Sequence, residues 1–220
     1  MMMADARADR LREFVREYLV WYGHASFRLT AGSGAVLYFD PYQIPAGQPA
    51  ADLILISHEH YDHFDPASLE ALRTPETTII VPEPMAAAGL TGLAAGRTLR
   101  REPFQILAVP AYTPEKPYHP RSKNWLGYIV TVDGVRVYHA GDTDHIPEMK
   151  DFEADIALLP VGGKYTMNPE QAAQAARDLG AGLYIPMHYG SVVGNPGDGM
   201  RFASSVPEGE ILIMNAAGAG

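Results

Sequence analysis

The 220-residue chain contains no cysteine, and this absence limits both how it is stabilised and what it can bind. Disulfide bonds and thiolate ligands are excluded, so any metal ion must be held by nitrogen and oxygen atoms. Apolar runs are short as well: none approaches the roughly 20 residues that cross a bilayer, and residues 1–16 lack the apolar centre of a signal peptide. We therefore expect a soluble, cytoplasmic protein with no membrane span.

Basic residues are scarce, with 17 Lys and Arg against 26 Asp and Glu and a formal net charge of -9. Proteins bind nucleic acids largely by neutralising phosphates, so this balance argues against a nucleic-acid partner and favours a small-molecule substrate. The hydrophobic content of 47% is enough for a substantial core. We expect one domain spanning residues 1–220, and a homo-oligomer is compatible with the sequence.

The most informative segment is residues 57–63, which read Ser-His-Glu-His-Tyr-Asp-His and directly follow the apolar run 53–56. Three imidazoles and a carboxylate suit Zn²⁺, Mn²⁺ or Fe²⁺, and ordinary packing gives no reason to gather them where a strand ends. A polar loop that happens to be rich in histidine is the alternative, and it explains the pattern less well. The candidate ligands are His58, His60, Asp62 and His63.

Strands and helices alternate along much of the chain, which predicts a mixed α and β protein. Strands are expected at residues 18–22, 26–29, 36–39, 53–56, 78–81, 104–109, 126–132, 135–139, 156–159, 183–185 and 210–214. Helices are expected at residues 5–18, 66–73 and 169–179, the last with Asn168 as its N-cap. The dipeptide Asp133-Gly134 favours a tight hairpin turn.

Two further strands lead into metal-capable side chains. Residues 135–139 precede Ala-Gly-Asp-Thr-Asp at 140–144, and residues 184–187 precede His188. Strand ends at one edge of a sheet can aim several ligands at one point and leave room for a substrate. Asp142 could instead be an acidic residue of a turn, and His188 could be a buried histidine with an ordinary hydrogen-bond partner. Neither residue indicates a metal site when it is taken alone.

Together these segments resemble the metallo-β-lactamase superfamily of metal-dependent hydrolases, whose hallmark is His-x-His-x-Asp-His. The resemblance covers nearly the whole chain, from Gly-His-Ala-Ser-Phe at 23–27 through Phe-Asp-Pro at 39–41 to Met-His-Tyr-Gly at 187–190. Within the superfamily, the chain is most similar to stand-alone hydrolases related to ascorbate-6-phosphate lactonase and to the phospholipase D type that cleaves N-acyl phosphatidylethanolamines. The resemblance implies an α+β fold, a four-layer αββα sandwich, with two metal ions.

The resemblance also implies how the ligands divide between the ions. His58 and His60 would hold the first ion, Asp62, His63 and His188 the second, and Asp142 would bridge them. Asp62, His63 and Asp142 are thus the expected catalytic residues. One or two Zn²⁺ ions are expected, with Mn²⁺ or Fe²⁺ as alternatives. Two cations about 3.5–4 Å apart would acidify a shared water to a hydroxide that attacks a carbonyl or phosphorus.

One ligand departs from the superfamily pattern, which usually places a third histidine just after the strand that ends here at Val109. This chain reads Val-Pro-Ala-Tyr-Thr at 109–113, and the nearest imidazole is His119. Prolines 114, 117 and 120 favour a stiff loop, so we expect His119 to return to the first metal. The alternative is a surface histidine, which would leave weaker or water ligation, or a single ion.

Other polar residues are candidates for supporting roles. The resemblance places His24 at the rim of the cleft, where it would bind substrate or support a ligand. Ligand imidazoles usually donate their second N–H to a carboxylate or carbonyl, which makes Asp40, Glu59 and Asp144 candidate partners, Asp40 being the best placed. His139 is expected to be a neutral histidine bonded to the backbone.

Two loops are candidates for substrate contact. Residues 160–168 combine two glycines, a cation, a phenol and a hydroxyl before a helix, which favours binding of a phosphate or carboxylate group. The alternative is a plain strand-to-helix connection. The candidate substrate-binding residues are Gly163, Lys164, Tyr165 and Thr166. Residues 191–200, rich in glycine, are expected to form a flap or irregular surface.

These patterns predict a metal-dependent hydrolase that uses a metal-bound hydroxide on an ester, lactone, amide or phosphodiester bond of a small molecule. A phosphodiesterase or nuclease of the same fold is one alternative, and the acidic balance counts against it. A non-catalytic metal-binding module is another, and the nearly complete ligand set counts against it. A diiron redox protein would need a flavin partner or domain, for which we expect no room in this chain.

Overall fold

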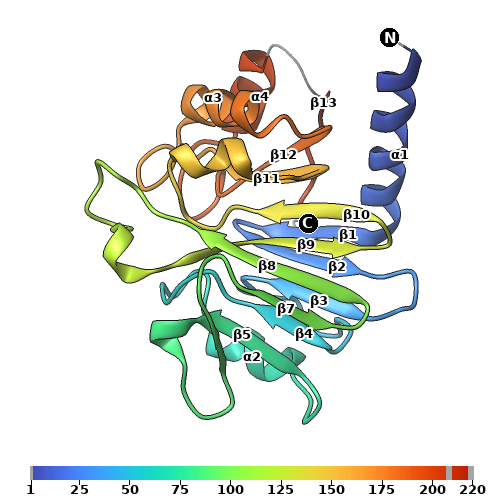
Figure 1. Ribbon diagram of the computed structural model, residues 1–220, viewed down its shortest axis with the longest axis vertical. Coiled ribbons are helices and arrows are strands. Elements are labelled where there is room, and N and C mark those ends of the chain that lie inside the picture. Colours follow the sequence, from blue (N-terminus) through green and yellow to red (C-terminus); the bar gives the residue numbers. More distant parts are fainter. Residues whose placement is uncertain (1, 207–209, 218–220) are drawn as a thin grey trace.

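Two mixed β-sheets pack against each other and carry helices on their outer faces (Figure 1). The structure, a computed structural model, describes residues 2–206 and 210–217. In spatial order, the first sheet contains β1 (Leu19–Gly23), β2 (Ser26–Thr30), β3 (Val36–Phe39), β4 (Leu53–Leu55), β5 (Thr78–Pro82) and β6 (Thr91–Leu93). The second contains β13 (Glu210–Ile211), β12 (Leu183–Met187), β11 (Ile156–Pro160), β10 (Val135–His139), β9 (Leu126–Val132), β8 (Phe104–Pro110) and β7 (Thr98–Arg101). The helices are α1 (Met2–Tyr18), α2 (Pro66–Leu72), α3 (Pro169–Leu179) and α4 (Asp198–Ser205), with short 3-10 turns η1 (Glu83–Met85), η2 (Arg121–Lys123) and η3 (Pro147–Asp151).

The apolar runs at the strands are continuous because both faces of the first sheet are covered. Alternate side chains of a strand point to opposite faces. Leu37 and Phe39 of β3 therefore join the core between the two sheets, whereas Tyr38 packs into a second core beneath helix α2 with Leu69 and Leu72. Strands β3, β4 and β5 run parallel to one another, as buried strands commonly do.

Helices α3 and α4 cover the second sheet beside β11 and β12 (Figure 1). The Tyr184 hydroxyl of β12 donates to the backbone carbonyl of Ala176 in α3 over 2.6 Å, which ties helix to sheet. Together with α2 on the other side, these layers form the αββα sandwich that the family resemblance implies.

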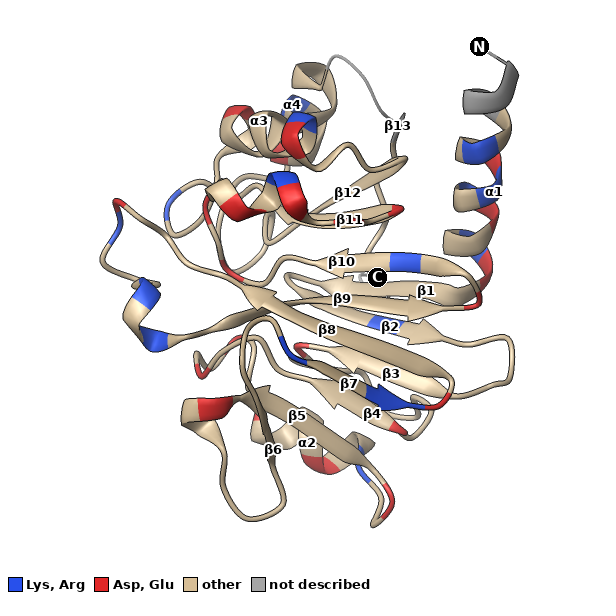
Figure 2. Ribbon diagram, in the orientation of Figure 1, with Lys and Arg blue, Asp and Glu red and all other residues tan. Residues whose placement is uncertain are grey.

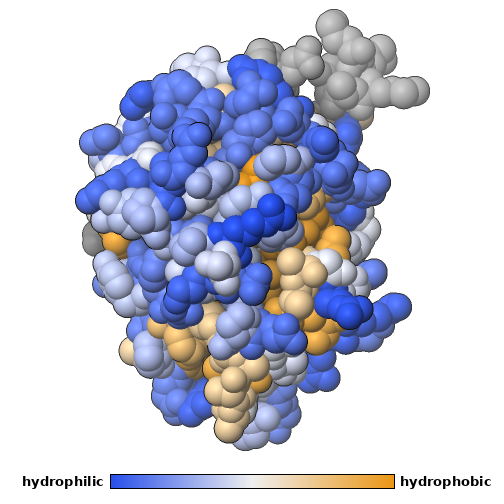
Figure 3. All heavy atoms as spheres, turned by 60° about the vertical axis from the view of Figure 1, so that its left-hand side comes forward, coloured by the Kyte–Doolittle hydropathy of each residue, from blue (hydrophilic) through white to orange (hydrophobic). Residues whose placement is uncertain are grey.

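Charged residues are absent from several central strands. Strands β8, β9, β11 and β12 carry none, whereas helix α1 and many of the connecting loops carry both signs (Figure 2). The surface seen in Figure 3 is mostly hydrophilic, with hydrophobic residues in patches toward its right and lower parts. In the part of the chain that the structure describes, no helix is both long and apolar enough to cross a membrane.

The predicted bounds of many elements agree with the observed bounds to within one or two residues, including those of β3, β9, β10 and α3. Helix α1 begins earlier than the predicted residue 5, and β13 ends at Ile211, before the predicted residue 214. Two edge strands, β6 and β7, lie outside the predicted strands. Strand β7 reads Thr-Leu-Arg-Arg and therefore shows no apolar face in the sequence. Helix α4 begins at Asp198, inside the segment 191–200 for which the sequence analysis expects a flap or irregular surface and no helix.

Helix α3 begins with a reciprocal cap that is specific enough to test. The Asn168 side chain accepts from the Gln171 backbone N–H, and the Gln171 side chain accepts from the Asn168 N–H. Replacing Asn168 with Ala should lower the free energy of unfolding by about 1 kcal/mol, measured by urea denaturation. Gln174→Ala, an exposed change within the same helix, is the matched control and should stay within about 0.5 kcal/mol of wild type. Equal effects of the two changes would refute the cap.

Candidate metal centre

The histidine-rich loop is fixed at its start by a buried carboxylate from the neighbouring strand. Asp40 follows β3 and has a left-handed backbone, with φ at 41°. Its carboxylate accepts from the Ser57 backbone N–H at 2.7 Å and from the Ser57 hydroxyl at 2.6 Å. Because parallel strands β3 and β4 end side by side, these bonds hold the loop where it leaves β4.

The same carboxylate fixes the orientation of two imidazoles. His63 Nδ1 lies 2.7 Å from Asp40 Oδ2 and can only donate to that oxygen. The Ser57 hydroxyl donates to Asp40, so it accepts from His58 Nδ1 at 2.9 Å. In the neutral form of each ring the proton therefore sits on Nδ1, and Nε2 is left free and turned toward the interior of the site, as metal-binding histidines require.

A first group of ligand atoms comes from His58, His60 and His119, which lie within 4.8 Å of one another. His58 Nε2 and His60 Nδ1 are only 3.0 Å apart, so the two atoms cannot both carry a proton. His119 is 1% exposed, and the structure brings this loop histidine to the other two. The indole of Trp125 packs beside all three rings, with its centroid 4.9 Å from that of His58.

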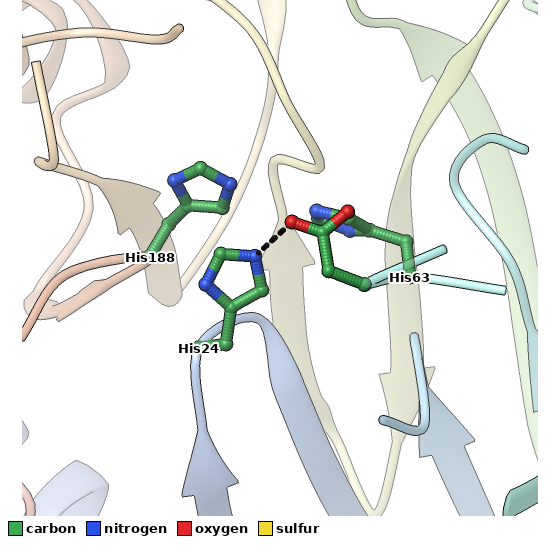
Figure 4. A group of neighbouring side chains, drawn as sticks. His24, His63 and His188 are labelled. Carbon is green, nitrogen blue, oxygen red and sulfur yellow. Dashed lines mark hydrogen bonds and ion pairs between the residues drawn. The ribbon is translucent and has the colours of Figure 1, made fainter. Parts of the chain in front are cut away.

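A second group comes from Asp62, His63 and His188, joined by His24, again within 4.8 Å of one another. Figure 4 shows the rings of His24, His63 and His188 gathered around one carboxylate, with a dashed line marking the 3.0 Å contact between His24 Nε2 and Asp62 Oδ2. The backbone N–H of His188 donates to the His24 carbonyl over 2.9 Å. His24 is thus bonded to two neighbours in this group.

Asp142 lies between the two groups and presents one oxygen to each. Its Oδ2 is 3.2 Å from His119 Nε2 and 4.0 Å from His58 Nε2. Its Oδ1 is 3.1 Å from His188 Nε2 and 3.4 Å from His63 Nε2. The three segments that follow β4, β10 and β12 therefore meet in one place, together with the loop between β8 and β9.

The electrostatics of the cluster keep Asp142 anionic. Burial by itself would raise its pKa, but the charges of His188 and His63 and the nearby His119 imidazole hold the pKa well below its ordinary value. Burial likewise opposes charge on His63, but Asp142 and Asp40 raise its pKa to about 9. In contrast, burial and the neighbouring His63 lower the pKa of His58 well below its usual range. Carboxylate charge in this dry space requires a positive partner.

Several buried polar atoms in the cluster have no hydrogen-bond partner, although buried polar atoms nearly always have one. They are His24 Nδ1, His63 Nε2, Asp142 Oδ1, and both ring nitrogens of His119 and of His188. The Nε2 atoms of His63, His119 and His188 all lie within 3.4 Å of Asp142 oxygens, and imidazole nitrogen with carboxylate oxygen is the donor set of Zn²⁺ and similar ions. The residues present therefore fit divalent cations.

The loop that carries His119 is held by hydrogen bonds rather than by its prolines alone. The Thr113 N–H donates to the His119 carbonyl over 2.8 Å. Lys116 Nζ donates to the Thr166 carbonyl over 2.6 Å and also pairs with Asp144. Among the described residues, the Asp144 carboxylate is thus bonded to this lysine and not to an imidazole of the cluster.

Other histidines and acids lie outside the cluster. Glu59 accepts from Lys123 at 2.8 Å and from the Trp125 indole N–H at 3.3 Å, so it supports the indole. His139 Nε2 is 2.8 Å from the Ala25 carbonyl, and burial lowers its pKa, as expected for a neutral histidine bonded to the backbone. His145 pairs with Asp178 at 2.8 Å, near the surface.

A pocket of about 320 Å³ opens beside the cluster. It is lined by His60, Tyr61, Asp62, Tyr118, His119, Asp142, Tyr165, His188, Val192 and Val193. The two valines belong to residues 191–200, one of the two candidate substrate loops, whereas sequence reasoning singles out none of Tyr61, Tyr118 and Trp125. Only their closeness to the predicted ligands along the chain could have suggested them.

The predicted substrate loop is brought to the pocket only in part. Tyr165 lines the pocket, whereas Lys164 is exposed and lies over the Tyr165 ring, 4.9 Å from its centre. Thr166 is fully buried. Gly163 has φ at 84°, which a side chain rarely adopts, and its N–H donates to the Met167 carbonyl. This loop therefore turns toward helix α3 and offers the pocket mainly an aromatic ring.

An αββα sandwich with a His/Asp cluster at strand ends of both sheets defines the metallo-β-lactamase fold. Residues 18–188 match the model of the Beta-lactamase superfamily domain. The chain belongs to this superfamily and, within it, to the UPF0173 metal-dependent hydrolases.

Named relatives and solved structures agree with this assignment. A UPF0173 metal-dependent hydrolase of Methanoregula boonei is 33% identical over 219 residues, covering 92% of this chain and 96% of the relative. Another, of Methanoculleus marisnigri, is 36% identical over 195 residues, covering 78% and 80%. A crystal structure from Parabacteroides distasonis has a TM-score of 0.79 at 38% identity, covering 89% and 91%. Igni18, a metallo hydrolase of Ignicoccus hospitalis, has a TM-score of 0.74 at 25% identity, covering 90% and 94%.

One glycine beside the cluster has no room for a side chain. A Cβ at Gly162 would lie 2.2 Å from the His188 carbonyl oxygen. Gly162→Ala should therefore displace His188 and lower bound metal, measured by elemental analysis of the purified protein. Gly197→Ala is the matched control, because nothing lies within 4 Å of its Cβ position. Full metal content in the Gly162 variant would show that this close approach does not position His188.

Proposed function

We propose that this protein is a hydrolase that works with two divalent cations, Zn²⁺ being the leading candidate. The observation that carries the proposal is the position of the Asp142 carboxylate, whose two oxygens face two separate groups of ligand atoms. The proposed ligands of the first cation are His58, His60, His119 and Asp142, and those of the second are Asp62, His63, His188 and Asp142.

When bound, such cations supply Lewis acidity that polarises a substrate oxygen and lowers the pKa of water toward neutrality. The residues of the chain orient the ligand atoms. Asp40 and Ser57 hold His58 and His63 in the tautomer that leaves Nε2 free. Trp125 packs against the first group and excludes water from that side.

His24 positions Asp62 through a hydrogen bond from its ring Nε2–H. Burial lowers the pKa of His24 to about 4, so the ring is neutral near pH 7. Its Nε2 proton then lies in the hydrogen bond to Asp62 Oδ2. That bond and the nearby His63 outweigh burial and keep the pKa of Asp62 below its ordinary value. Asp62 is therefore held as an anion with its other oxygen available to a cation.

The proposed reaction is hydrolysis of an ester, lactone, amide or phosphodiester bond of a small molecule. Lactones are included because the sequence resembles hydrolases related to ascorbate-6-phosphate lactonase. The decisive experiment measures turnover of p-nitrophenyl acetate, a simple γ-lactone and bis-p-nitrophenyl phosphate by zinc-loaded protein. At least one substrate should be hydrolysed, with activity lost on chelation and restored by added Zn²⁺. No chelator-sensitive turnover of any of them would favour a binding protein.

Two variants test the proposed division of ligands by metal content. His119→Ala and Asp62→Ala should each reduce bound zinc by about one ion per chain, because each removes a ligand from a different group. Both should keep the far-ultraviolet circular dichroism of wild type, since neither side chain belongs to the apolar core. His145→Ala, whose imidazole pairs with Asp178, is the control and should keep full metal content. Unchanged zinc in the His119 variant would remove that residue from the site.

A further inference from the structure

The walls of the pocket beside the cluster are aromatic and aliphatic. Apart from the proposed ligands, the described residues that line it are Tyr61, Tyr118, Tyr165, Val192 and Val193. Its volume of about 320 Å³ suits a small molecule rather than a polymer.

Exposed apolar side chains gather at this pocket. The described residues include five large hydrophobic side chains that are exposed: Tyr61, Tyr118, Val192, Met200 and Ile213. Three of these five line the pocket, and Tyr61 is 67% exposed. Folding gives no reason to leave such side chains in water at one place, so their grouping points to an apolar ligand.

The aromatic wall is braced by contacts between rings. Tyr118, from the His119 loop, meets Tyr165 edge to face with centroids 4.7 Å apart. Tyr61 similarly meets Tyr42 at 6.0 Å. Rings packed in this way lose little freedom when a ligand binds, which favours a defined apolar subsite.

No cation is available along these walls to recognise a charged substrate group. Among the described lining residues there is no Lys or Arg, whereas phosphate groups are usually bound by such side chains. The nearby lysines have other partners: Lys116 pairs with Asp144, and Lys123 pairs with Glu59. Lys164 lies over the Tyr165 ring and outside the lining. An anionic substituent would therefore meet no counter-charge from the walls.

We propose that the substrate is an uncharged carboxylic ester or lactone whose acyl part is apolar, and that this part lies against Tyr118, Tyr165 and Val192. This inference rests on the proposed hydrolase function. In the reaction the water oxygen forms a bond to the acyl carbon, and the bond from that carbon to the leaving oxygen breaks. One proton of the water passes to the leaving oxygen, which gives an alcohol and a carboxylic acid.

The test compares p-nitrophenyl acetate, butyrate and hexanoate with bis-p-nitrophenyl phosphate, using zinc-loaded full-length protein. The leaving group is constant, so differences among the esters report on the acyl part. Each buried methylene group contributes roughly fourfold, and butyrate has two more than acetate, so kcat/KM should rise about fifteenfold from acetate to butyrate. The phosphodiester should be the poorest substrate.

Variants locate the preference in the pocket. Tyr118→Ser and Val192→Ser should each lower the ratio of kcat/KM for butyrate over acetate at least threefold. Met200→Ser, an exposed change outside the lining, is the control and should leave that ratio at the wild-type value. Circular dichroism checks that each variant is folded. A ratio unchanged in both pocket variants would overturn the inference.

The outcomes separate this inference from the function on which it rests. Chelator-sensitive turnover with no preference for longer acyl groups, or with the phosphodiester fastest, overturns the apolar acyl subsite and leaves the hydrolase. If no substrate is turned over, the hydrolase proposal fails. Binding to zinc-loaded protein, measured by calorimetry, then tests the subsite. The p-nitrophenyl ester of hexanoate should bind at least tenfold more tightly than that of acetate. Equal affinities would overturn it.

Discussion

A buried carboxylate among imidazoles is the interaction on which the rest of the site depends. Asp142 is 4% exposed, and its oxygens lie 3.1 to 3.4 Å from ring nitrogens of His188, His119 and His63. Taking a charge out of water is costly unless an opposite charge accompanies it. Protons on imidazoles can supply that charge, and divalent cations can supply it with all the rings neutral. The site is therefore arranged to hold positive charge at one fixed place.

The two-sheet architecture provides the rigidity that this arrangement needs. Strands β4, β10 and β12 each end at the cluster, so three segments far apart in sequence deliver ligands from regular structure. Asp40 binds Ser57 and His63, and the His24 carbonyl binds the His188 N–H, so the first sheet fixes groups from both sides of the site. The pocket walls, in contrast, come from loops, where specificity can change without disturbing the ligands.

Sequence reasoning recovers the parts of this structure that are local. The histidine-rich loop follows an apolar strand, and its spacing alone indicates a metal site. Strand β7 was missed because its pattern carries no apolar face, and α4 because glycines at 194, 197 and 199 hide its start. The position of His119 does not follow from the local sequence, because its loop is held by bonds from Lys116 to the distant residues Asp144 and Thr166. Long-range contacts of that kind leave no periodic signal in the chain.

The central claim is that two cations share the Asp142 carboxylate. Anomalous diffraction at the zinc edge, from crystals of zinc-loaded protein, tests it most directly. Two peaks are predicted, one bound by His58, His60 and His119 and the other by Asp62, His63 and His188, with Asp142 touching both. Peaks elsewhere on the protein, or none within this cluster of residues, would contradict the account.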